Sequence, residues 1–263
     1  MGAARLRRRR RARPAHRGAG LLLARAPLGR LPHRAAVVNK RIVLWRHGRT
    51  EWNVLGRVQG QTDVPLDDEG RRQARVAAPR LADLLPARVI SSDLDRARST
   101  AQALVDLVDV ELEIDPRLRE VSFGEREGMT LKQAWSRWPE EMRGMFENTG
   151  LRIPGAETYE EAGERVATAL RELADSLDDG ETAVVVSHGA SIRTGACAFV
   201  GLPAGYWQVF SGLSNCASVY LEERYAGPGR TWRIQEWNSW TPPEPVMSDD
   251  ERDPDLGESG GVG

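Results

Sequence analysis

Two histidines of this 263-residue chain stand where a reactive group would be expected. His47 and His188 each follow a continuous apolar run, residues 42–45 and residues 183–186, and each precedes a glycine. Apolar runs of this kind are typical of buried strands in a parallel sheet. Open α/β sheets bind their ligands at the carboxyl ends of such strands, which share one edge. The two imidazoles are therefore predicted to meet.

Two arginines accompany these histidines. Arg46 directly precedes His47, and Arg96 stands on the first turn of the helix expected after a strand at 89–92. Buried cations need an anion, and a guanidinium fork matches the oxygens of a phosphate. A lone histidine at a strand end is most simply a core residue bonded to one carbonyl. A pair of them with two arginines predicts a pocket for a phosphomonoester, which carries a charge of about −1.5 to −2 at pH 7.

A metal centre is the chemical alternative for two histidines. Two arginines would repel a dication, and neither Cys nor Asp stands at ligand spacing near His47. We therefore expect no metal ion and no other cofactor.

The elements that must position these side chains alternate between strand and helix. Helices are expected at 67–85, with Asp67 as N-cap, and at 93–108, 130–148, 158–177 and 189–200. Strands are expected at 41–46, 89–92, 111–114 and 182–187, followed by a hairpin of 217–223 and 231–237 at the sheet edge. This order predicts one doubly wound α/β domain, with a mainly parallel sheet and helices on both faces. The helix at 130–148 is expected to be an insertion over the site.

Charge is unevenly distributed along the chain. Residues 1–40 contain eleven Arg, one Lys and no acid, and so carry a charge of +12. Because the net charge of the whole chain is −1, the other 223 residues carry −13. An acidic body argues against general nucleic-acid binding, and no stretch reaches the length of a transmembrane helix. We therefore expect neither a nucleic-acid partner nor a membrane.

Composition also suggests the chain's boundaries. Residues 1–38 are interpreted as a basic disordered leader or as sequence upstream of the true start codon, with a basic arm as the alternative. Residues 39–240 are expected to form the folded domain, and residues 241–263 a disordered acidic tail. The two cysteines, Cys197 and Cys216, are too few for a disulfide framework, which favours a reduced, cytoplasmic chain.

Five segments carry a family resemblance. Residues 44–53 resemble the Arg-His-Gly signature of the histidine phosphatase superfamily, which has the phosphoglycerate mutase-like fold. The segment 60–70 resembles the loop and first helix of that family, and 91–97 its second arginine motif. Residues 118–128 resemble its acid motif, and 187–189 its second histidine motif. The matches occur in order and cover about residues 40–240, which implies that 39–240 is a histidine phosphatase domain.

The resemblance implies a chemical role for each matching residue. His47 would be the nucleophile and would form a phosphohistidine, which requires a neutral imidazole whose pKa nearby cations lower. The carbonyl of Gly48 is a candidate partner for its other ring nitrogen. Glu120 would be the general acid for the leaving group and then the base for water. Without the resemblance, Glu120 would be interpreted as a surface charge in a charged loop.

The remaining matches imply a binding site for the phosphoryl group. Asn53 would donate a hydrogen bond to it, and His188 would act best there when protonated. Thr50 and Gln59 are candidates for substrate contact, with a loop hydrogen bond as the alternative for each. The phosphate-binding set implied by the resemblance is Arg46, Thr50, Asn53, Gln59, Arg96, His188 and Gly189.

Three segments bear on the reaction type. The stretch 121–128 departs from the Tyr-Gly pattern of cofactor-dependent mutases and looks like the phosphatase branch. Residues 215–218 and 232–238 resemble bacterial glucosyl-3-phosphoglycerate phosphatases, although a hairpin that buries Trp232 and Trp237 would give the same pattern. We expect a phosphomonoester hydrolase that acts on glucosyl-3-phosphoglycerate or another small phosphorylated metabolite. The alternatives are a phosphoglycerate mutase-type phosphotransferase and a non-catalytic phospho-ligand-binding protein. A homodimer is left open.

Overall fold

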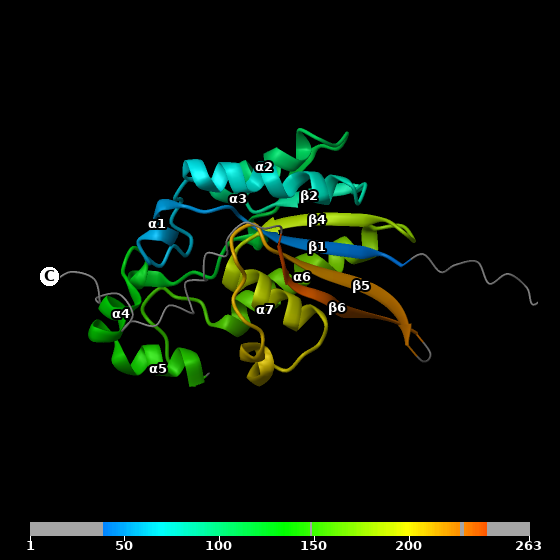
Figure 1. Cartoon of the computed structure of the whole chain (residues 1–263). Coiled ribbons are helices and arrows are strands. Elements are labelled where there is room, and N and C mark those ends of the chain that lie inside the picture. The colour runs from blue at the N-terminus through cyan, green and yellow to red at the C-terminus, as the bar shows by residue number, and fades with distance from the viewer. Residues whose placement is uncertain (1–38, 148, 227–228, 241–263) are drawn as a thin grey trace, which may run out of the picture. The chain divides into compact units, whose positions relative to one another are not determined.

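The computed structural model describes residues 39–147, 149–226 and 229–240. One sheet contains six strands in the order β3-β2-β4-β1-β5-β6 (Figure 1). The strands are β1 (Arg41–Arg46), β2 (Arg88–Ser91), β3 (Leu112–Ile114), β4 (Thr182–Ser187), β5 (Ser218–Ala226) and β6 (Gly229–Ser239). The first four are parallel, whereas β5 runs antiparallel to β1 and to β6. The prediction of a mainly parallel sheet with an antiparallel hairpin at one edge is confirmed.

The register of the two central strands places the histidines together. Arg46 is the partner of Ser187 where β1 and β4 pair, so the next residue of each strand is a histidine at the same level. The backbone N–H of His47 donates to the Ser187 carbonyl at 3.1 Å, which extends the pairing by one residue. Both imidazoles therefore leave the sheet at the carboxyl ends of neighbouring strands.

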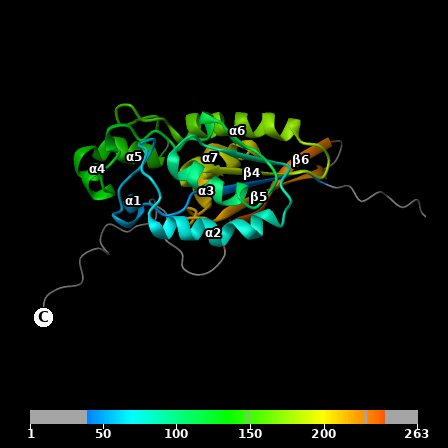
Figure 2. The same cartoon turned by 90° about the horizontal axis from the view of Figure 1, so that it is seen from above.

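Helices cover both faces of the sheet, as predicted. α2 (Asp68–Ala82) and α3 (Asp95–Val105) pack on one face, and α6 (Tyr159–Ser176) and α7 (Gly189–Phe199) pack on the other. Figure 2 shows α2 and α6 on opposite sides of the strands. Alternate residues of β1 enter the two cores, Val43 and Trp45 on the α2 side and Ile42 and Leu44 on the α6 side. Burial on both faces explains why the strand is apolar throughout.

The helical insertion differs from the expected single helix at 130–148. It consists of α4 (Leu131–Arg137) and α5 (Pro139–Glu147), separated at Trp138. Trp138 adopts φ −135° and ψ 63°, because the proline that follows disfavours the helical conformation at this position. Together with α1 (Glu51–Val54), these helices gather beyond the carboxyl ends of the parallel strands (Figure 1).

Other boundaries differ more modestly. α2 and α3 each end three residues earlier than expected, at Ala82 and Val105, and α1 was not predicted. Three short 3-10 helices were also not predicted, η1 (Pro116–Leu118), η2 (Gly124–Arg126) and η3 (Ala204–Val209). The proposed leader at 1–38 and tail at 241–263 lie outside the described residues. Within the described part of the chain, no helix has the length and apolar character needed to cross a membrane.

Candidate active site

His47 is oriented by its own backbone. Its Nδ1 lies 2.7 Å from the carbonyl oxygen of Gly48, as the sequence predicted. A carbonyl can only accept, so Nδ1 carries the hydrogen and Nε2 keeps a lone pair. The ring of His188 lies beside it, with the two ring centroids 5.2 Å apart. The predicted meeting of the two histidines is therefore confirmed.

His188 lies in a chain of hydrogen bonds with Arg96. The Nε of Arg96 donates to His188 Nδ1 at 3.2 Å, and His188 Nε2 lies 2.9 Å from the hydroxyl of Ser92. Because Nδ1 accepts, Nε2 carries the hydrogen and donates to Ser92. The other nitrogens of Arg96 donate to the carbonyls of Thr62 at 2.8 Å and Gly60 at 2.6 Å.

Arg46 completes the cationic side of the site. Its Nη1 donates to the Leu213 carbonyl, and its buried Nε has no hydrogen-bond partner within the described residues. A Cβ atom on Gly189 would lie 3.4 Å from the guanidinium carbon of Arg46, so the start of α7 approaches this side chain closely. A buried guanidinium whose Nε has no hydrogen-bond partner is suited to bind an oxyanion, to which it can donate.

Burial and charge keep both imidazoles neutral. Burial is the main cause that holds the pKa of His47 well below its ordinary value of 6.5, followed by the charges of Arg96 and Arg46. Burial and Arg96 likewise hold the pKa of His188 well below 6.5. The expected direction for His47 is confirmed, although burial contributes more than the cations. Burial beside Arg96 disfavours a cationic His188 here, and the action of a protonated His188 on a bound phosphoryl group stays a prediction.

Glu120 is buried at the start of α7. Its carboxylate accepts hydrogen bonds from the backbone N–H groups of Val121 at 2.9 Å, Ser191 at 2.8 Å and Ala190 at 3.2 Å. Two of these donors, the N–H groups of Ala190 and Ser191, belong to the first turn of α7, so the start of this helix holds the carboxyl group in place. Glu120 is thus not a solvated surface charge, since it is only 8% exposed.

Asn53 and Thr50 are placed by the local helix start. Thr50 caps α1 in a reciprocal capping box with Asn53, so its hydroxyl accepts a hydrogen bond from the first turn of this helix. The Asn53 amide oxygen accepts from the Thr50 backbone at 3.0 Å and from Asn215 Nδ2 at 3.3 Å. Contact of Asn53 with a phosphoryl group stays a prediction. Gln59 is buried, and its Oε1 accepts no hydrogen bond within the described residues. Contact of Thr50 or Gln59 with substrate stays a prediction.

Two polar residues of this site were not predicted from the sequence as site residues. Ser92 bonds His188, and Asn215 donates to the carbonyl of His47 at 3.1 Å. Asn215 lies three residues before the start of β5, and β5 is antiparallel to β1. The start of an antiparallel neighbour lies at the edge where β1 ends, so topology was a signal that could have identified this residue.

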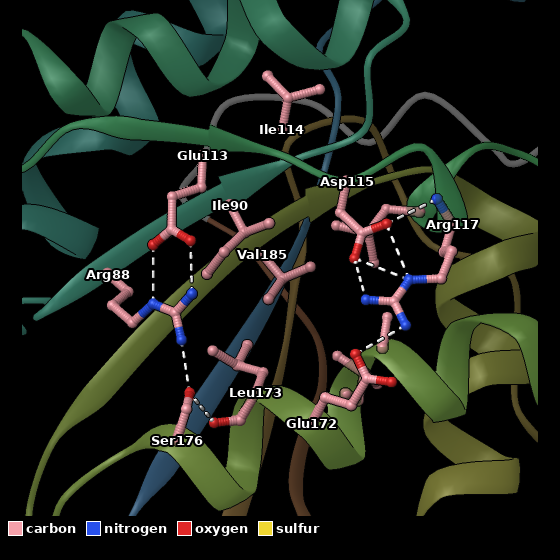
Figure 3. Close-up of a pocket in the computed structure, with 13 residues that line it drawn as sticks. Arg88, Ile90, Glu113, Ile114, Asp115, Arg117, Glu172, Leu173, Ser176 and Val185 are labelled. Carbon is pink, nitrogen blue, oxygen red and sulfur yellow. Dashed lines mark hydrogen bonds and ion pairs between the residues drawn. The ribbon is translucent and has the colours of Figure 1, made fainter.

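A cavity of about 340 Å³ lies elsewhere, between α6 and strands β2 and β3 (Figure 3). Its floor is formed by apolar side chains that include Ile90, Leu173 and Val185. The arginines at its rim are already neutralised, because Arg88 pairs with Glu113 at 2.5 Å and Arg117 with Asp115 at 2.7 Å. In contrast, Arg46 forms no ion pair within the described residues. The charge needed for a phosphate is therefore at the histidine pair and not in this cavity.

No group of three His, Cys, Asp or Glu side chains in the described residues gathers closely enough to hold a metal ion. The two histidines instead face guanidinium groups, which attract anions. The arrangement of a neutral nucleophile, two arginines and a carboxylate fits transfer of a phosphoryl group.

Comparisons with known proteins agree with this geometry. The family model of the histidine phosphatase superfamily (branch 1) matches residues 42–239. A glucosyl-3-phosphoglycerate phosphatase of Mycolicibacterium vanbaalenii is 34% identical over 213 residues, with 76% of this chain and 95% of the relative covered. A probable phosphoglycerate mutase GpmB of Serratia proteamaculans is 37% identical over 197 residues, with coverages of 74% and 89%.

A solved structure is also similar. The structure of a mycobacterial glucosyl-3-phosphoglycerate phosphatase with VO3 has a TM-score of 0.69 and 32% sequence identity, and the match covers 76% of this chain and 98% of that chain. Together with the arrangement of His47, His188 and Arg96 described above, these matches show that the chain is a phosphatase that belongs to the histidine phosphatase superfamily (branch 1).

Proposed function

We propose that this phosphatase hydrolyses a small phosphomonoester through a phosphohistidine on His47. In the first step, Nε2 of His47 attacks phosphorus and the P–O bond to the leaving alcohol breaks, while the Glu120 carboxyl group gives its proton to the leaving oxygen. In the second step, water attacks the phosphohistidine, the P–N bond breaks, and Glu120 takes the proton that water loses. Inorganic phosphate and the free enzyme result.

The observation that carries this proposal is the orientation of His47. Its Nδ1 is committed to the Gly48 carbonyl, its pKa is lowered, and Arg46 and Arg96 stand beside it. A neutral imidazole with a free Nε2 is a competent nucleophile. The guanidiniums supply fixed positive charge for the three oxygens that share charge in the transition state.

For the substrate, we favour glucosyl-3-phosphoglycerate or a similar phosphorylated metabolite. The support comes from relatives that bear that name. They are 32–34% identical to this chain, and the alignments cover 95% of each relative's length. The relative named as a probable phosphoglycerate mutase makes phosphoryl transfer to a second metabolite the alternative. The two reactions differ only in the acceptor of the second step.

A phosphate-release assay tests the proposal directly. With p-nitrophenyl phosphate, we expect turnover that survives a chelator and that falls by about 10³-fold or more in His47→Ala. The acid-labile phosphate trapped on the wild-type enzyme should be absent from this variant. His16→Ala, which changes a histidine outside the described domain, is the matched control. Loss of activity with chelator would instead favour a metal enzyme.

A substrate panel separates the candidate activities. Glucosyl-3-phosphoglycerate, 3-phosphoglycerate and simple sugar phosphates should be compared by kcat/KM, with phosphate release and phosphoryl transfer measured in parallel. A preference for glucosyl-3-phosphoglycerate with release of phosphate is expected. Equal values for all substrates would mean a broad phosphatase, and net transfer between glycerate positions would mean a mutase.

We also propose a cytoplasmic enzyme without a nucleic-acid partner, with a homodimer as a candidate assembly. One observation supports the cytoplasmic location, and a second supports the absence of a nucleic-acid partner. Cys197 and Cys216 are free and buried, and burial raises the pKa of Cys197 to about 12, as expected for structural thiols. The acidic charge of the chain after residue 40 disfavours a polyanion.

A further inference from the structure

The orientation of the Arg96 side chain is set by the loop at residues 60–62 as well as by its own helix, α3. Two of its guanidinium nitrogens donate to the carbonyls of Gly60 and Thr62, at 2.6 and 2.8 Å. Its Nε donates to His188. The direction of the guanidinium therefore depends on where residues 60–62 lie.

The base of this loop is fixed by backbone pairing. Val58 and the segment 128–129 exchange hydrogen bonds, from Val58 N–H to the Met129 carbonyl at 2.9 Å and from Gly128 N–H to the Val58 carbonyl at 2.8 Å. This pairing stops before Gly60. At the tip, the Thr62 N–H donates to the Gln59 carbonyl and the Gln61 side chain to the Glu120 carbonyl, each at 3.1 Å, and the backbone N–H of Gln61 requires a further acceptor.

The carboxylate of Glu127 supplies that acceptor. Its Oε1 accepts from the backbone N–H groups of Gln61 at 3.0 Å and Phe123 at 3.1 Å. Its Oε2 accepts from the backbone N–H of Thr62 at 2.9 Å and from the Thr62 hydroxyl at 2.6 Å. Four donors on two ionised oxygens use the full accepting capacity of a carboxylate, and an amide could not accept all four.

Gly60 shows how closely the loop and the carboxylate fit. Its φ is +55°, and a Cβ atom there would lie 2.8 Å from Cγ of Glu127 and nearer still to the carboxylate. Only glycine adopts this conformation readily and also leaves the space that the glutamate occupies.

We propose that Glu127 is the positioning residue for Arg96. Its carboxylate fixes residues 60–62, whose carbonyls aim the guanidinium at the phosphoryl group. The inference rests on the proposed function, because it assigns Glu127 to the same phosphoryl-binding site, although Glu127 itself touches only the loop and Phe123.

The test compares Glu127→Gln with Glu125→Gln. Glu125 lies two residues away, is exposed and pairs with Arg137 at the surface, so it controls for loss of a charge in this segment. Vanadate binding reports on the phosphoryl site without turnover, and p-nitrophenyl phosphate reports on kcat/KM. We expect Glu127→Gln to weaken vanadate binding and to lower kcat/KM, each by about tenfold, and Glu125→Gln to leave both within twofold.

A second pair of variants tests the contact itself. Gly60→Ala should displace the Glu127 carboxylate, so Gly60→Ala and Glu127→Ala should each reduce vanadate affinity. In the double variant the losses should be clearly less than multiplicative, since both remove one contact. Multiplicative losses would overturn the inference, because they would mean that the two residues act separately.

Arg96→Ala separates this inference from the proposed function. If Arg96→Ala loses vanadate affinity while Glu127→Gln keeps it, the role of Glu127 is wrong and the proposed site stands. If Arg96→Ala also keeps it, the phosphoryl site itself is wrong. Should Glu127→Gln fail to fold, Thr62→Val removes only the 2.6 Å hydroxyl contact, and unchanged vanadate affinity in that variant would equally contradict the inference.

Discussion

Single residues decide the protonation state of this site. The sequence predicted the Gly48 partner of His47, because the carbonyl of the next residue is always near. It attributed the low pKa of His47 to neighbouring cations, whereas burial is the larger cause. Burial depends on helices that close over the strand ends, and a motif of adjacent residues does not contain that information.

The histidine pair should stay neutral well below pH 6.5. The pKa values of His47 and His188 are both held well below the ordinary value of 6.5. We expect the imidazole C–H resonances of both residues, assigned with His47→Gln and His188→Asn, to remain unshifted between pH 8 and pH 6.5 in an NMR titration. A midpoint at or above 6.5 for either residue would contradict this assignment.

Ser92 should matter mainly through His188, because its other hydroxyl contact, with the backbone N–H of Leu94, is longer at 3.3 Å. It is fully buried, and its hydroxyl accepts the Nε2 hydrogen of His188 at 2.9 Å. In Ser92→Ala that donor loses its partner, and we expect kcat to fall by about two- to tenfold, in line with the net value of one hydrogen bond. The neighbouring Ser91→Ala is the control, because Ser91 is equally buried and bonds only the backbone of Ser92. Equal kcat values for the two variants would exclude this role.

At the level of elements, the sequence predicts strands and helices that show a hydrophobic period or an N-cap residue. β1 and β4 match the expected limits, and Asp67 and Thr158 cap α2 and α6 with side-chain hydrogen bonds. The loop contacts of the site could not be predicted in this way. The carbonyls of Gly60 and Thr62 that hold Arg96 have no sequence signature, because any residue type supplies a carbonyl. For Thr50 the sequence left substrate contact and a local hydrogen bond as alternatives, and the N-cap of α1 shows that the local hydrogen bond forms.

The contact between α6 and α7 sets the position of Glu120. A Cβ atom on Gly195 of α7 would lie 2.6 Å from Cβ of Val166 in α6, a side chain that cannot turn away. Alanine normally stabilises a helix by up to about 1 kcal/mol over glycine. Here we expect Gly195→Ala to destabilise the protein by about 1–3 kcal/mol through overpacking, and to lower activity because α7 holds the Glu120 carboxylate.

Urea unfolding measures the effect on α6 and α7. Adding Val166→Ala should recover part of the loss caused by Gly195→Ala, because the colliding atoms are removed. Gly205→Ala is the control, since a Cβ atom there meets nothing within 4 Å. If Gly195→Ala were as stable as Gly205→Ala, the helices would have room to separate, and the argument for tight packing would be wrong.

At the level of the whole molecule, residues 1–36 should be dispensable for catalysis. All the residues assigned to the site lie between Arg46 and Asn215 in the described domain. We expect deletion of residues 1–36 to leave kcat/KM for p-nitrophenyl phosphate within twofold of the full chain. A large drop in kcat/KM would show that the segment contributes to the active enzyme.

The buried histidines should also make the stability of the whole domain depend on pH. Well above pH 6.5 the imidazoles are neutral in both the folded and the unfolded chain. As the pH falls below 6.5, both histidines bind protons in the unfolded chain but not in the folded chain, so the free energy of unfolding decreases. The loss is at most about 1.4 kcal/mol per pH unit for each histidine, or about 2.8 kcal/mol per pH unit for the pair.

Carboxylates should not obscure this window. Hydrogen bonds from Arg119 lower the pKa of Asp93 below its ordinary value of 3.8, so its contribution is lost only at more acidic pH. Urea titrations at steps from pH 7.5 to pH 5.5 should therefore show a steep fall in unfolding free energy for the wild type. The fall should be much shallower in His47→Gln/His188→Asn, which lacks both imidazoles. Because His16 and His33 are present in both proteins, equal slopes would mean that the buried pair takes up protons in the folded state, and the neutral nucleophile would have to be abandoned.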